Sequence, residues 1–189
     1  MTSCFGGLLE CCQGPSYTAT ASYAQLNDAL GSDVVIVKNG HRVCGTGGAL
    51  GNAPIVQNKA YFEAKVQQTG VWAIGLANKD VNLNEPMGVD ESSWVIKQDS
   101  KVYSKNTEIG AFNEPVEEGD VIGITYDHDE LTFYRNGQPT NCVIRGIRAR
   151  DLYPAFYVAD GAILDVKFNH FWHDAPSGFG EIMLEQTIL

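Results

Sequence analysis

Hydrophobic and polar positions alternate with a period of two along most of the chain after residue 33. In the segment 61–66, YFEAKV, Phe62, Ala64 and Val66 share one side, and Tyr61, Glu63 and Lys65 take the other. The same alternation recurs in 70–77 (GVWAIGLA), 121–126, 131–134, 152–158 (LYPAFYV) and 162–168 (AILDVKF). Alternation of this kind predicts strands of a sheet with one face on a core and one face wet.

Turn signals separate these predicted strands. Asn39-Gly40 and Asn136-Gly137 each stand between β-branched or aromatic runs, and both residue types tolerate the positive φ that tight hairpins need. The acidic stretch 127–130 is expected to form a four-residue polar loop. One segment differs: Tyr23, Leu26 and Leu30 lie at helical spacing, so a short helix or turn is expected over 22–30.

About eight to ten short strands with little helix predict an all-β fold, a two-sheet antiparallel β-sandwich. We expect three regions. Residues 1–21 form a flexible cysteine-containing segment, 22–175 the sandwich domain, and 176–189 an apolar tail docked on it. The segment 80–92 is long and polar, and is expected to be a surface loop that carries binding.

The charge of the 189-residue chain limits its partners. The formal net charge is −10, so nucleic acid and anionic membranes are poor partners for the surface as a whole. No transmembrane span or signal peptide is expected, which favours a cytoplasmic location. Arg145, Arg148 and Arg150 form a local exception, either as a solvated loop or as a dock for an acidic partner.

The five cysteines fall into two groups. Cys44 and Cys142 are expected to be reduced, small core residues. Cys4, Cys11 and Cys12 crowd the N-terminus beside leucines, where they form either a thiol-bearing tail or sites of S-acylation. Peripheral membrane attachment is expected only in the acylated case.

The acidic stretch 127–130, Asp-His-Asp-Glu, has two possible roles. The residues form a turn, or they contribute to a metal or catalytic cluster. The turn is favoured, because the spacing lacks the ligand pattern of a calcium loop and the facing carboxylates of a glycosidase strand. His170 and His173 flank Phe171-Trp172 and are expected in a packed aromatic corner. No cofactor or metal site is predicted.

The order of these segments resembles the SPRY domain family, the core of the wider B30.2 group. The most specific piece runs from Gly119-Asp120-Val121-Ile122-Gly123 to Phe133-Tyr134-Arg135-Asn136-Gly137, and the resemblance covers roughly 33–170. It implies a bent two-sheet sandwich without catalytic activity or cofactor, whose rim loops bind peptides or protein surfaces. Peptide-binding members place an aromatic residue near the position of Asp160, so their specificity does not transfer.

The resemblance implies a partner site on one rim, built from the loop after the first hairpin, the mid-domain loop and the turn after the LYP strand. The candidate contact residues are Thr46, Gly47, Gly48, Asn84, Glu85, Met87, Asp90, Trp94, Asp160 and Gly161. Met87 and Trp94 are expected to be the exposed anchors, with Trp94 in the core as the alternative. The predicted function is a non-enzymatic adaptor or subunit of a larger assembly. The alternative is a glycan-binding or glycan-cleaving sandwich.

Overall fold

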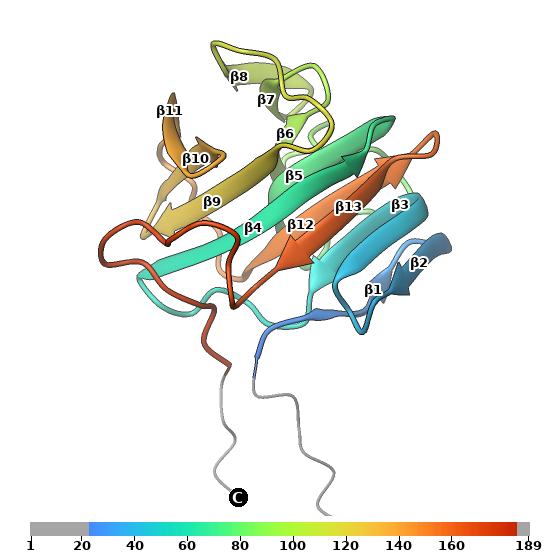
Figure 1. Cartoon of the computed structure of the whole chain (residues 1–189), viewed down its shortest axis with the longest axis horizontal. Coiled ribbons are helices and arrows are strands. Elements are labelled where there is room, and N and C mark those ends of the chain that lie inside the picture. The colour runs from blue at the N-terminus through green and yellow to red at the C-terminus, as the bar shows by residue number, and fades with distance from the viewer. Residues whose placement is uncertain (1–22, 185–189) are drawn as a thin grey trace, which may run out of the picture.

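The computed structural model describes residues 23–184, and within that range the chain forms strands and no helix (Figure 1). No element of residues 23–184 is therefore a helix that could cross a membrane. The strands are β1 Leu26–Leu30, β2 Asp33–Val37, β3 Arg42–Gly51, β4 Lys59–Gln68, β5 Val71–Asn78, β6 Ser93–Lys97, β7 Lys101–Ser104, β8 Thr107–Ala111, β9 Val121–Asp127, β10 Glu130–Arg135, β11 Gln138–Ile144, β12 Leu152–Ala159 and β13 Ile163–Lys167.

The strands pair antiparallel in two sheets, which confirms the predicted sandwich. Sheet A has the order β1-β3-β12-β5-β6-β7-β8, and sheet B has the order β2-β3-β13-β4-β9-β10-β11. The far edges, β8 and β11, also touch, so the sandwich nearly closes on itself.

Strand β3 belongs to both sheets and turns the corner between them. Its first half pairs with β2 and β13, and its second half pairs with β1 and β12. Gly45 and Gly47 sit at the change with φ of 95° and 131°, values that L side chains rarely adopt. The stretch Gly45–Gly48 is thus a strand corner. The expectation of a loop there was wrong, because glycine bends a paired strand as readily as it makes a turn.

The main core fills the space between the sheets. Trp72, Ile74 and Leu76 of β5 point into it, as the alternation predicted. Phe62 of sheet B and Phe156 of sheet A meet edge-on, with ring centroids 5.9 Å apart, and Phe168 packs 6.1 Å from both. These aromatic contacts join the two layers beyond the energy of buried area alone.

The outer face of sheet A is not wet, in contrast to the expectation. The loop 79–92 folds back over it and builds a second hydrophobic cluster with Met87 at its centre, only 1% exposed. The expectation that Met87 is an exposed anchor was therefore wrong. Gly48 makes the room for it: a Cβ there would lie 2.8 Å from Met87 Cε.

The outer face of sheet B is also partly covered. The segment after β13 crosses over β4 and β9 (red in Figure 1), and it buries Tyr61 and Glu63 of β4. Phe171 packs edge-on against Tyr61, with centroids 4.8 Å apart, which confirms part of the predicted aromatic corner, whereas Trp172 and His170 are exposed. Further on, Gly180 accepts a hydrogen bond from Tyr61 N at 2.7 Å, and Ile182 is buried in the core.

The hairpin turns follow the sequence signals, with one difference. Lys38, Asn39 and Gly40 have positive φ between β2 and β3, and Asn136 and Gly137 have positive φ between β10 and β11. The acidic stretch is also a turn, but Asp127 and Glu130 pair as strand residues. Only His128 and Asp129 form the loop, so the expected four-residue loop was too long.

Two further expectations were wrong. The segment around Leu26–Leu30 is strand β1 and not a helix, because it pairs with the distant Ala49 and Gly51 of β3. Cys44 is half-exposed on the outer side of β3, whereas Cys142 is buried in the core as predicted. The candidate acylation sites Cys4, Cys11 and Cys12 lie outside the described residues.

Candidate functional site

The rim predicted from the sequence corresponds to one end of sheet A. There, β3 and β12 pair Gly48 with Tyr157 and Gly47 with Val158, and β5 begins at Val71 beside the end of β12. A small cavity of about 190 Å³ opens at this end. Its lining residues are Val71, Trp72, Ala73, Pro86, Met87, Lys97, Gln98 and Tyr157.

Tyr157 is the aromatic floor of this cavity, with 6% of its surface exposed. Burial raises the pKa of its hydroxyl, and the negative charges of Glu85 and Asp160 raise it further. The phenol therefore stays neutral and can donate a hydrogen bond. Glu85 directly precedes Pro86 of the lining, and Asp160 follows Tyr157 by three residues.

Lys97 supplies the one cation in the lining. Burial lowers the pKa of its ammonium group, and the neighbouring Asp99 raises it in part. The Nζ atom stands 4.8 Å from the centroid of the Tyr103 ring, which holds the side chain by a cation–π contact. A ligand at this cavity would meet an apolar floor, one cation and two carboxylates.

The loop beside the cavity is fixed before any ligand arrives. Leu83 accepts a hydrogen bond from Gly48 N at 2.7 Å. Asn84 Oδ1 accepts bonds from Ser32 N and Ser32 Oγ at 2.8 and 2.7 Å. A rim held in this way loses little conformational entropy on binding, which favours recognition of a partner.

The structure brings some of the predicted contact residues together and separates others. Thr46, Asn84, Glu85, Asp160 and Gly161 are exposed. Gly47 and Gly48 lie within strand β3 and Met87 lies in the second core, so these three offer no free side chain. The role of the exposed residues as partner contacts stays a prediction.

Asp90 and Trp94 do not belong to this site in the expected way. Asp90 Oδ1 accepts bonds from Ser92 N at 2.9 Å and Ser93 Oγ at 3.1 Å, so it stabilises its own turn. Trp94 alternates with Lys97 on β6 and faces the other side of sheet A, packed in part against the main core. It lines a different cavity, about 500 Å³, with Ile109, Val143 and Arg145.

The arginines of the 145–151 loop are exposed. Arg145 Nε contacts Glu130 Oε2 at 2.8 Å, so the positive charge of Arg145 is paired with a carboxylate of the same chain. The exposure of all three arginines agrees with the solvated loop that was one of the two alternatives for this segment.

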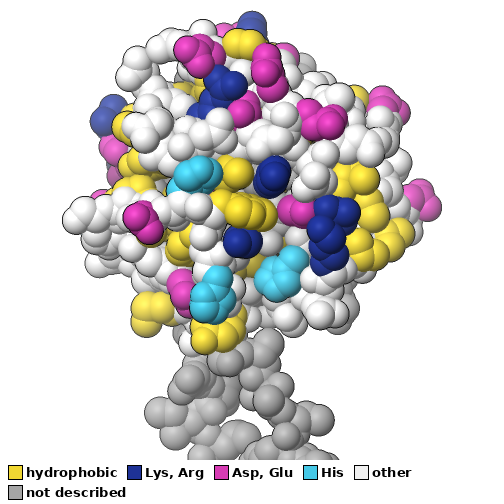
Figure 2. Space-filling model, in the orientation of Figure 1, with side chains coloured by type: hydrophobic (Ala, Val, Ile, Leu, Met, Phe, Trp, Pro, Cys, Tyr) yellow, Lys and Arg dark blue, Asp and Glu magenta, His cyan; other side chains and the backbone are white. Residues whose placement is uncertain are grey.

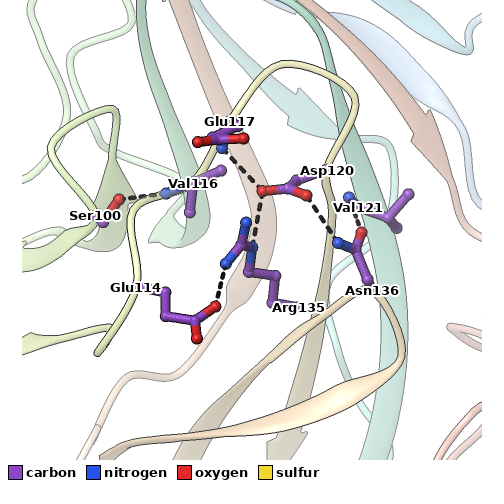
Figure 3. Close-up of polar contacts among 8 residues, drawn as sticks. All are labelled: Ser100, Glu114, Val116, Glu117, Asp120, Val121, Arg135 and Asn136. Atoms are coloured by element: carbon purple, nitrogen blue, oxygen red, sulfur yellow. Dashed lines mark hydrogen bonds and ion pairs between the residues drawn. The ribbon is translucent and has the colours of Figure 1, made fainter.

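The motif that carries the family resemblance, 119–123 with 133–137, joins the segment 112–120 to the β10–β11 turn (Figure 3). We call this set of contacts around Asp120 the clasp. Asp120 accepts hydrogen bonds from Arg135 Nε, Asn136 Nδ2 and Glu117 N at 2.7, 2.7 and 2.8 Å. Burial alone would raise the pKa of Asp120, but these three bonds outweigh it and hold the pKa below its usual range. The carboxylate is saturated with donors, so its role is to join loops.

The acidic turn is likewise engaged within the chain. Asp127 interacts with the His128 ring and with Lys59 Nζ, and the His128 hydrogen bond lowers the pKa of the Asp127 carboxyl most. In the described residues 23–184, no three His, Cys, Asp or Glu side chains gather in a group that could hold a metal ion.

Tyr157 and Lys97 are two cavity residues that were not among the predicted contacts, whereas Pro86 lies in the predicted binding loop 80–92. The alternation in LYPAFYV, with Phe156 inward, already places Tyr153 and Tyr157 on the outer side of sheet A. That pattern could have identified Tyr157. Lys97 gives no comparable signal, because its neighbours in the cavity come from remote parts of the chain.

Comparison with known proteins agrees with this architecture. Residues 59–170 match the SPRY domain family. The chain is 52% identical over 162 residues to SPRY domain-containing protein 7 of Homo sapiens and of Bos taurus, covering 84% of this chain and 82% of those proteins. It is 28% identical over 130 residues to E3 ubiquitin-protein ligase RKP of Arabidopsis thaliana, covering 65% of this chain and 10% of that protein.

Solved structures show the same fold. The SPRY domain of human HERC1 superposes with a TM-score of 0.65 at 14% identity, covering 77% of this chain and 99% of that one. The TRIM65 PSpry domain gives a TM-score of 0.63 at 14% identity, covering 77% and 89%.

Proposed function

The chain belongs to the SPRY domain family, and from this we propose that it is a non-enzymatic module that recognises a peptide or protein surface. The recognition site is the rim around Tyr157. The observation that supports this site most is the fixed rim itself: an aromatic-floored cavity of about 190 Å³ bordered by exposed Asn84, Glu85 and Asp160. Acting as an adaptor or assembly subunit, the module would work by occupying a surface of its partner.

The chemistry of the rim indicates what it would bind. The two exposed carboxylates of Glu85 and Asp160 outnumber the single Lys97 cation of the lining, and Tyr157 and Pro86 give the rim apolar contact area. A partner segment with a basic residue next to an apolar one complements both. The cavity takes one or two side chains, so the rest of an interface of ordinary size, about 800 Å² on each partner, would come from the surrounding rim.

Capture of partners from native cells tests this proposal. The double variant Glu85→Lys/Asp160→Asn reverses the charge of the rim, and Asn suits the positive φ of 51° at position 160. The variant Asp151→Asn/Glu181→Lys makes the same charge change at exposed positions elsewhere. Cross-linking of the full chain in cells followed by mass spectrometry would compare the two.

We expect proteins captured by the unchanged chain and by the Asp151→Asn/Glu181→Lys variant to be lost from the rim variant, with equal melting temperatures for all three. The same set of partners on both variants would contradict the rim site. A glycan array on the unchanged chain addresses the alternative function: a saturable signal with an oligosaccharide would favour a lectin over a protein-interaction module.

A further inference from the structure

The part of sheet B that the C-terminal segment leaves open carries a basic face. Strand register places Val37, Arg42, Asp165 and Lys65 in one row across β2, β3, β13 and β4. Figure 2 shows this side of the molecule, where Lys, Arg and His side chains gather near the centre while acidic side chains lie mostly toward the margin.

Cations outnumber carboxylates on this face. Asp165 binds Arg42 through both carboxylate oxygens, with Arg42 Nη2 at 2.8 Å, and also binds Lys38 at 3.2 Å. The single carboxylate of Asp165 thus pairs with two cations. Lys65 and Lys167 add two further positive charges on the same face. The surplus is local and positive on a chain whose net charge is −10.

Glu63 of β4, which pairs with Lys167 across the strands, does not neutralise this surplus at the surface. It is fully buried beneath residues 171–173 and accepts hydrogen bonds from Trp172 N, His173 N and Tyr61 Oη. Its charge is therefore shielded from solvent by the segment that it anchors.

An exposed indole ring borders the basic face. Trp172 is 36% exposed, and Lys167 Nζ stands 4.5 Å from its ring centroid while donating a hydrogen bond to His170 O at 2.8 Å. The two contacts fix Lys167 beside the ring. A groove of about 450 Å³ runs here, and its lining includes Lys38, His41, Asp165, Lys167, His170 and Trp172.

We propose that this groove binds a short acidic peptide segment of a partner protein, with carboxylates on Lys38 and Lys167 and an apolar side chain on Trp172. Charge complementarity favours this occupant. A membrane or a nucleic acid would extend beyond the groove and meet the acidic remainder of the surface, which repels it. An extended peptide advances only about 3.3 Å per residue, so a few residues fill the groove without leaving it.

This second surface lies on the opposite sheet from the rim and takes a ligand of opposite charge, so it is independent of the rim proposal. The probe is a short fluorescein-labelled peptide of alternating Glu and Leu, followed by fluorescence anisotropy with the full chain. The variant Lys38→Gln/Lys167→Gln removes the two lysines. The control Lys79→Gln/Lys101→Gln makes the same charge change in sheet A, directly after β5 and at the start of β7.

We expect the Lys38→Gln/Lys167→Gln variant to bind the probe at least about tenfold more weakly than the Lys79→Gln/Lys101→Gln variant, because it removes both charge-assisted contacts to the carboxylates of the probe. Trp172→Ala should weaken binding of the Glu-Leu probe more than binding of a Glu-Gly probe, because it removes the apolar contact as well as the ring that holds Lys167. The rim variant Glu85→Lys/Asp160→Asn should bind the Glu-Leu probe at least as well as the unchanged chain.

The single variant Lys38→Gln tests the proposal with little risk to the fold, because Lys38 is about half exposed and Asp165 keeps Arg42 as its partner. This variant should bind the Glu-Leu probe severalfold more weakly than the unchanged chain, at an unchanged melting temperature. Equal binding by the two double variants would overturn the proposal. So would a preference of the unchanged chain for phosphatidylserine vesicles or a single-stranded oligonucleotide over the peptide.

Discussion

The carboxylate of Asp120 and the guanidinium of Arg135 face each other at 2.7 Å, from Oδ2 to Nε, at the mouth of the β9–β10 hairpin (Figure 3). Asp120 precedes β9 and Arg135 ends β10, so the pair locks one end of the hairpin. Arg135 Nη1 reaches Glu114 at 2.8 Å and extends the lock to the loop after β8. The most specific motif of this chain therefore serves the fold.

Replacing Asp120 by Asn should lower the free energy of unfolding by about 2 kcal/mol, because charge-assisted hydrogen bonds are worth about 1.5–3 kcal/mol each and neighbouring donors would lose their acceptor. Urea unfolding measures the change. Glu117→Gln is the control, since only its backbone N–H contacts Asp120. Equal stability of the two variants would show that the clasp contributes little.

Acid should remove this contribution. The folded pKa of Asp120 lies below the unfolded value of about 3.9, so the stabilisation is complete above that value and is lost as pH falls through the folded pKa. The gap in unfolding free energy between the unchanged chain and Asp120→Asn should therefore shrink below about pH 4. Unfolding curves at a series of pH values test this, and a constant gap down to about pH 2 would contradict it.

Glu63→Gln should loosen the segment that covers β4. The carboxylate accepts bonds from Trp172 N, His173 N and Tyr61 Oη, whereas an amide would present N–H groups to some of these donors. We expect a loss of about 1–3 kcal/mol and faster amide exchange at Trp172 and His173. Tyr61→Phe removes a single donor and should cost less; unchanged exchange in Glu63→Gln would refute this anchoring.

Met87→Ala should destabilise the protein by about 3 kcal/mol, as expected for truncating a buried methionine. Val89→Ala lies in the same loop at an exposed position, and should change stability by less than about 0.5 kcal/mol. Thermal unfolding compares them. A Met87→Ala chain with full stability but lost partner capture would restore Met87 as a contact residue.

Gly75→Ala should cost more than about 2 kcal/mol, because a Cβ at this position would lie 2.1 Å from the backbone oxygen of Trp94 and force β5 and β6 apart. Gly180→Ala is the matched control, since a Cβ at that position would meet no atom within 4 Å and the change should be nearly neutral. Soluble yield and urea unfolding of both variants give the comparison. Similar stability would mean that the sheet adjusts freely.

The sequence by itself determined most of the strands and the turns that join them, although it gave no signal for β6, β7 and β8. Alternation placed Phe62, Ile74 and Leu164 in the core, and Asn136-Gly137 marked its hairpin, because side-chain direction and turn dihedrals are local properties of the backbone. It failed at Leu26–Leu30, where a short apolar spacing fits a helix and a strand equally well and only pairing with β3 decides.

Only the tertiary structure decided what covers the outer faces of the sheets. Met87 and Glu63 look like exposed residues in the sequence, and both are buried because segments remote in the chain fold over them. The same holds for the basic groove, where Lys38 and Lys167 lie far apart in sequence and meet through β-strand register. Long-range packing depends on contacts between distant segments, and no local periodicity encodes those contacts.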